Sequence, residues 1–197
     1  MFRRARLTLA GVLVAAAVSG CLNGTDPSTG FAVSGRIQNR TGRPIPADAR
    51  LVVIWGVSSG SPDYSYVYGE GVIDRITGTI HVRFDGPPPA EALNAGVLGV
   101  GFLVATTDQA LKDGDVITNG SQLTGILGIT AQHAVIFVGT HPDTMQMGDW
   151  VPAFETGYGL GVGVKVPGTF DKFVPTSPSS ALLIIDALAN IEVVNWT

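Results

Sequence analysis

The residues Phe31-Ala-Val-Ser-Gly-Arg-Ile-Gln38 alternate, with Phe31, Val33 and Ile37 all on one side. Successive side chains of a β-strand point to opposite faces, so this alternation predicts a half-buried strand. A turn is expected directly after it, where Gly42 is free to adopt a positive φ angle. A second, more buried strand is expected from Arg50 to Val57. The ordered part of the chain therefore opens with two strands joined by a short connection.

The rest of the chain continues this pattern. It holds 26 glycines and 12 prolines, which separate short apolar or alternating segments. Strands at this spacing indicate an all-β fold, an antiparallel β-sandwich formed by one domain over residues 31–197. Further strands are expected at 64–76, 79–84, 97–105, 131–138 and 155–166. A loop is expected at 167–180, and a strand pair or a helix-to-strand unit at 181–196.

One expected strand has a face without side chains. Glycines recur at every second position from Gly157 to Gly163. Glycine in a strand usually marks the close approach of another backbone or of a large side chain. Gly99 and Gly101 repeat the feature in another strand. We expect a partner strand with the same bare face, or a tyrosine that covers both glycine faces.

A longer motif spans the first two strands. It reads Gly35-x-Ile37-x4-Gly42-x-Pro44-Ile45-x3-Ala49-x-Leu51-x-Val53. This motif is similar to the opening hairpin of carboxypeptidase-regulatory-like and transthyretin-like domains. The resemblance implies an Ig-like antiparallel sandwich whose first two strands pair with each other. It implies no enzymatic activity.

The first 21 residues have the layout of an export signal. Three arginines precede a twelve-residue apolar run, Leu7 to Val18. A membrane-spanning helix needs about 20 apolar residues, and a buried core helix fits poorly with the arginines before this run. Charge, length and small residues together favour a secretory signal at residues 1–20. Residues 22–30 are turn formers and would serve as a flexible tether.

The end of this signal resembles the lipobox of bacterial lipoproteins. Val18-Ser19-Gly20 precedes Cys21, the only cysteine of the chain. The resemblance implies cleavage before Cys21 and attachment of lipid to its thiol. The protein would then be exported and held at a membrane. Leu22 stands where an inner-membrane retention signal would have Asp, which favours the outer membrane if the host is Gram-negative.

The charge balance bears on possible partners. Because three of the 12 basic residues lie in the leader, the remaining chain has 9 basic and 16 acidic residues, a net charge of −7. Nucleic-acid binding requires clustered positive charge. We therefore expect no nucleic-acid partner.

Two groups of residues are candidates for ligand binding. Tyr64, Tyr66 and Tyr68 alternate along one expected strand and could stack on sugar rings, although cross-strand packing explains the same pattern. His141, Met145 and Met147 lie in a long loop. Thioether sulfur selects Cu(I), and exported copper chaperones are similar in combining His with two Met. The alternative is that the methionines fill gaps in the packing.

No catalytic pattern is present in the sequence. Asp113-Gly114-Asp115 lacks the alternating oxygens of an EF-hand loop. His81 and His133 have no metal-ligand spacing, and no Gly-x-Ser-x-Gly nucleophile elbow occurs. We therefore expect no enzyme and no cofactor. The expected function is a lipid-anchored structural or protein-interaction module of the cell envelope, with a glycan-binding or copper-binding module as the alternative.

Overall fold

The structure is a computed structural model that describes residues 30–58, 63–130, 132–140, 154–164 and 172–186. These residues form strands and two short 3₁₀ turns, so the predicted all-β class is confirmed. The strands are β1 Phe31–Asn39, β2 Arg50–Val57, β3 Tyr64–Asp74, β4 Thr79–Phe84, β5 Leu98–Thr106, β6 Val116–Ile117, β7 Ile126–Ile129, β8 His133–Val138, β9 Gly157–Val164, β10 Lys172–Thr176 and β11 Ala181–Ile185. The 3₁₀ turns are η1 Ala90–Ala92 and η2 Gly120–Gln122.

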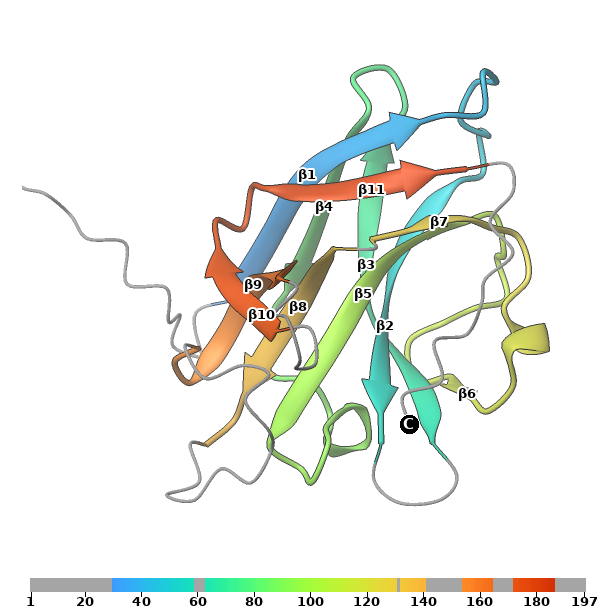
Figure 1. Ribbon diagram of the computed structural model, residues 1–197. Helices are drawn as coiled ribbons and strands as arrows, with labels where there is room; N and C mark the ends of the chain where they lie inside the picture. The colour runs from blue at the N-terminus through green and yellow to red at the C-terminus, as the bar shows by residue number, and fades with distance from the viewer. Residues whose placement is uncertain (1–29, 59–62, 131, 141–153, 165–171, 187–197) are drawn as a thin grey trace, which may run out of the picture.

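The strands form a barrel-like closed sheet rather than a clearly Ig-like sandwich (Figure 1). The order β5-β2-β3-β4-β1-β11-β7 returns to its start, because β7 pairs with both β11 and β5. β8, β9 and β10 extend the sheet from the first half of β5. Among the described pairings, β1 with β11 is parallel and the others are antiparallel. The expected two-sheet arrangement is corrected by this closure.

The expected opening hairpin is also corrected. β1 pairs with β4 and β11, whereas β2 pairs with β3 and β5. The first two strands are therefore separated by β3 and β4 around the ring, although β1 has the predicted alternation and β2 is the more buried of the two, as predicted. The connection between them crosses one end of the barrel (Figure 1).

The core is centred on Trp55 and Phe84, both almost completely buried. Their ring centroids lie 6.1 Å apart in an edge-to-face arrangement, which aromatic quadrupoles favour. Tyr158 of β9 stacks on Phe84 at 4.9 Å and on Phe31 at 5.3 Å. Side chains of the β8–β9 extension thus pack into the same core as those of the barrel strands.

Aromatic rings cover the glycine faces, but they belong to a tryptophan and a phenylalanine and not to the expected tyrosine. A Cβ atom on Gly99 would lie 2.6 Å from the Trp55 ring, and one on Gly159 would lie 2.8 Å from the Phe154 ring. Contacts this short exclude any side chain at these positions. The glycine faces therefore accommodate the indole of Trp55 and the phenyl ring of Phe154 instead of a second glycine strand.

Candidate functional site

The three tyrosines of β3 are half-buried and lie against the barrel, not on an open face. Tyr66 pairs in register with the fully buried Trp55, and Tyr66 and Tyr68 pack against the main core. The Tyr64 hydroxyl donates to the Glu91 carbonyl at 2.8 Å. The Tyr68 hydroxyl donates to the carbonyl of Gly86, which lies in the same β4–β5 connection as Glu91. This placement favours the packing alternative over a sugar platform.

The connection that follows β4 is held from two sides. Gly86 accepts hydrogen bonds from the Tyr158 hydroxyl at 2.7 Å and from the Tyr68 hydroxyl at 3.3 Å. Burial raises the pKa of both hydroxyls, so each stays protonated and keeps donating at any physiological pH. These hydroxyls close the end of the barrel at which β1 begins.

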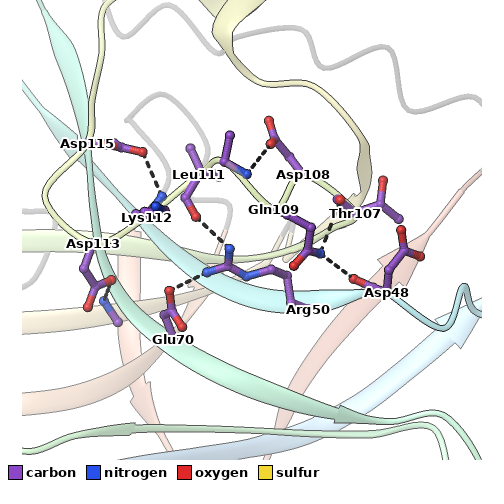
Figure 2. Close-up of polar contacts among 12 residues, drawn as sticks. Asp48, Arg50, Glu70, Thr107, Asp108, Gln109, Leu111, Lys112, Asp113 and Asp115 are labelled. Carbon is purple, nitrogen blue, oxygen red and sulfur yellow. Dashed lines mark hydrogen bonds and ion pairs between the residues drawn. The ribbon is translucent and has the colours of Figure 1, made fainter.

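Acidic residues gather on the outside of the β2–β3 pair, in the segment 107–115 (Figure 2). Arg50 is at their centre. One Nη of Arg50 donates to the Leu111 carbonyl at 2.8 Å, and the other forms an ion pair with Glu70. Gln109 donates from its amide to the Asp48 carbonyl at 2.9 Å. These bonds join the segment to the start of β2.

The carboxylates of this segment are occupied by backbone N–H groups and by a hydroxyl. Asp113 accepts the Gly69 N–H at 3.0 Å and Asp115 accepts the Lys112 N–H at 2.7 Å. Burial raises the pKa of the Asp113 carboxyl. Asp108 accepts the Thr124 hydroxyl at 2.6 Å and the Ala110 N–H at 2.9 Å, and these bonds lower its pKa.

The segment thereby covers a second apolar cluster on the outside of the barrel. Leu111 and Ile117 are buried there against Val52, Ile54 and Val67. Carboxylates that already accept hydrogen bonds from N–H groups and a hydroxyl of the fold are not arranged around a cation. Within the described residues, no group of three His, Cys, Asp or Glu side chains is placed to hold a metal ion. The bonds of Arg50 instead hold the segment 107–115 over this apolar cluster.

The two described histidines lie apart, on β4 and β8. The exposed His81 shares a hydrogen bond of 2.8 Å between its Nδ1 and the Ser34 Oγ. Sequence reasoning missed this pair, because only the β1–β4 register brings the two residues together. No described carboxylate hydrogen-bonds to His81, and the pair lies on an open sheet face, so the Ser-His-acid arrangement of a nucleophile is incomplete. His133 has a buried Nδ1 without a partner in the described part, and burial lowers its pKa.

An open groove of about 690 Å³ lies at the end of the barrel where β1 finishes. It runs between the β1–β2 connection and the β3–β4 turn. Ile37, Ile45 and Ile73 provide its apolar surface. Ile76, at the tip of the turn, is 97% exposed. Sequence reasoning missed the groove for two reasons. An isolated isoleucine in a turn does not indicate a binding site, and the two sides of the groove are distant in the chain.

The remaining predicted site residues lie outside the described residues. They are the lipid-attachment residue Cys21 and the copper-binding candidates His141, Met145 and Met147. In the described ranges, no helix is both long enough and apolar enough to cross a membrane.

Comparisons with known proteins give no relative. No family model, no curated protein and no solved structure matches this chain.

Proposed function

We propose that this protein is a lipid-anchored, non-catalytic interaction module of a bacterial cell envelope. The proposal joins two parts of the chain. Residues 1–21 would direct export and supply the lipid-bearing Cys21, and the barrel would present a binding surface. Residues 22–30 would link the two.

The anchor is supported by the sequence pattern from Arg3 to Cys21. The barrel begins with β1 at Phe31. A tether of nine residues between Cys21 and the barrel spans at most about 30 Å. Lipid on Cys21 would therefore keep the barrel close to the membrane surface.

The binding role is carried by one observation, the groove with the exposed Ile76 at its edge. The polar clusters described above are satisfied by bonds within the fold. The groove differs from them, since it combines open apolar surface with polar edges. A concave surface with apolar lining and a few polar groups is the usual form of a binding site.

Lipidation is tested by expressing the full chain in a Gram-negative host that is fed radiolabelled palmitate. We expect label on the protein and partition of the protein into the detergent phase of a Triton X-114 extract. The Cys21→Ser variant should lose both properties. A Ser19→Thr variant serves as the control, since it leaves the thiol in place. Equal labelling of the wild type and the Cys21→Ser variant would exclude the anchor.

A further inference from the structure

His133 begins β8 at the point where the sheet divides. β5 pairs with β8 along its first half and with β7 along its last residues. Leu103 lies between these two stretches and is bonded to Thr130, because it donates its N–H to the hydroxyl at 3.1 Å and accepts the Thr130 N–H at 2.9 Å. On its other side β8 pairs with β9, and His133 is in register with Val162. We call this end of the β8–β9 ladder, at His133 and Val162, the split.

The imidazole of His133 lies on the core face of β8. Because side chains alternate along a strand, it shares this face with Val135 and Phe137, which belong to the main core. Its Nδ1 is buried and has no hydrogen-bond partner in the described part of the chain. The residue as a whole is half-buried, so solvent reaches part of it. One ring nitrogen is thus held in an apolar site, in a group that can still take up a proton.

The strands around the split offer no carboxylate to neutralise a charged ring. The sequences of β5, β7, β8, β9 and β11 contain no Asp, Glu, Lys or Arg. β10 contributes Lys172, which is in register with Val164 and therefore lies on the same face of the sheet as Val162 and His133. The charge of Lys172 has the same sign as an imidazolium. The neighbouring strands therefore disfavour a positive charge on His133.

The other titratable groups of these segments lie away from the split. Tyr158 pairs with Phe137 near the opposite end of the β8–β9 ladder, and Glu155 precedes β9 at that same end. Burial raises the pKa of the Tyr158 hydroxyl, so it stays uncharged. Asp186 follows β11, and its N–H bonds to the carbonyl of Leu127, six residues before His133.

From this placement we propose that His133 is an acid-sensitive switch, whose protonation opens the split and releases the end of the β8–β9 ladder from the barrel. A neutral imidazole has a proton on one nitrogen, whereas a charged imidazole has a proton on both. Protonation therefore places an N–H at the buried Nδ1, where no described group accepts it. A buried charge without a partner is costly, and opening of the split returns the ring to water. The switch depends neither on the lipid anchor nor on the groove.

The direction of the pH effect follows from the burial of the ring, which lowers the pKa of His133 in the closed barrel. In the open state the ring titrates near the usual value of about 6.5, so the open state takes up a proton at a higher pH than the closed state. The closed split is therefore at its most stable above about pH 6.5 and loses stability as the pH falls below this value. Opening would expose Val135 and Leu160, which are fully buried in the closed barrel.

The test measures amide hydrogen exchange by NMR in the full-length protein in detergent, between pH 7.5 and pH 5.0, with the rates corrected for intrinsic exchange. The probe is the Gly163 N–H, which bonds to the Gln132 carbonyl at 2.7 Å beside the split. Its protection should fall about threefold or more over this range. The Ile37 N–H bonds to the Gly78 carbonyl at 2.7 Å, at the groove, and should keep its protection.

Matched variants assign the effect to one ring. His133→Phe keeps an aromatic ring at the split but removes the titrating nitrogens, so the protection of Gly163 should no longer depend on pH. His81→Phe is the control, because His81 is exposed on β4, and this variant should respond to pH as the wild type does. NMR titration of the His133 ring in the wild type needs no variant and should give a midpoint below about 6.5.

Three results would overturn the inference. They are a protection of Gly163 that is constant from pH 7.5 to pH 5.0, a pH response that persists in His133→Phe, and a midpoint of the His133 ring at or above the usual histidine value. A response that disappears only in His81→Phe would assign it to the other histidine. Loss of palmitate labelling would remove the anchor alone, since the exchange experiment is decided without it.

Discussion

Ala95 adopts a positive φ angle of 49°, in the left-handed region that disfavours every residue with a Cβ atom. The turn around it is fixed by Asn94, whose amide donates to the Gly56 carbonyl at 3.1 Å and whose side-chain oxygen accepts the Ser58 N–H at 2.6 Å. The strain at Ala95 is therefore imposed by a neighbour that joins β2 to the start of β5.

We expect the Ala95→Gly variant to be more stable than the wild type. Relief of the left-handed strain is worth about 1–2 kcal/mol, and the added freedom of the unfolded chain removes about 0.4–1 kcal/mol of that gain. Urea unfolding measures the difference. Ala32→Gly is the control and should destabilise the protein, because Ala32 is an exposed residue in the extended backbone of β1. An unchanged midpoint for Ala95→Gly would contradict the expected strain.

At the scale of elements, the segment 107–115 contains no strand or 3₁₀ turn, and Arg50 joins it to the start of β2. Without that side chain, the Leu111 carbonyl loses its donor and Glu70 loses its ion-pair partner. The segment would then be held to β3 by bonds such as that from the Gly114 N–H to the Val67 carbonyl, 2.8 Å long, without the support of Arg50. Without Arg50, the segment 107–115 would therefore open locally and expose the outer apolar cluster around Leu111 and Ile117.

The Arg50→Met variant should therefore lose about 1–3 kcal/mol of stability, the usual cost of an unsatisfied buried polar group. Faster amide hydrogen exchange at Gly114 and Asp115 should accompany this loss. Arg83→Met is the matched control, because its ion pair with Asp85 is exposed and such pairs contribute about 0–1 kcal/mol. Equal effects of the two variants would show that Arg50 does not fasten the segment.

The element scale also shows what sequence patterns can predict. β2 and β4 have the expected bounds, since alternating or continuously apolar residues signal a strand directly. β7 was not expected, and β10 lies inside a segment predicted to be a loop. Both are short, and they contain Gly128 and Pro175, residues that usually indicate turns. Their pairing partners, not their own residues, make them strands.

For the candidate site, the sequence predicted the strand that carries the three tyrosines but not the face that it turns to the core. The groove has no signal in the sequence, because residues 37–45 and 73–78 are brought together by the β1–β4 and β3–β4 ladders and by the bond from the Ile37 N–H to the Gly78 carbonyl. Closure of the sheet was missed for the same reason. Such contacts depend on register, which a single sequence does not reveal.

For the whole molecule, closure depends on two glycines beside β11. A Cβ atom on Gly128 would lie 1.9 Å from the Ile184 carbonyl oxygen, and one on Gly35 would lie 2.1 Å from the Ala181 carbonyl oxygen. Both obstacles are backbone atoms, which cannot rotate away. β11 therefore fits between β1 and β7 only while both positions lack side chains.

The Gly128→Ala variant should force β7 and β11 apart and open the ring. We expect a loss of about 1–3 kcal/mol or more, the range found for overpacked sites, together with faster amide exchange along β7 and β11. Gly56→Ala is the control, because no atom lies within 4 Å of the added Cβ. If both variants unfold at the same urea concentration, the ring does not depend on close approach at Gly128.

The parallel pairing of β1 with β11 also sets the order of assembly. The first and the last of the described strands share a ladder, so the contact that completes the ring links residues separated by most of the chain. Such contacts carry a large loop-closure entropy and slow the folding of β proteins. During synthesis, everything up to β10 can emerge while the gap between β1 and β7 is still empty. Among the described strands, β11 is the one that closes the ring, and until it arrives the facing edges of β1 and β7 remain unpaired.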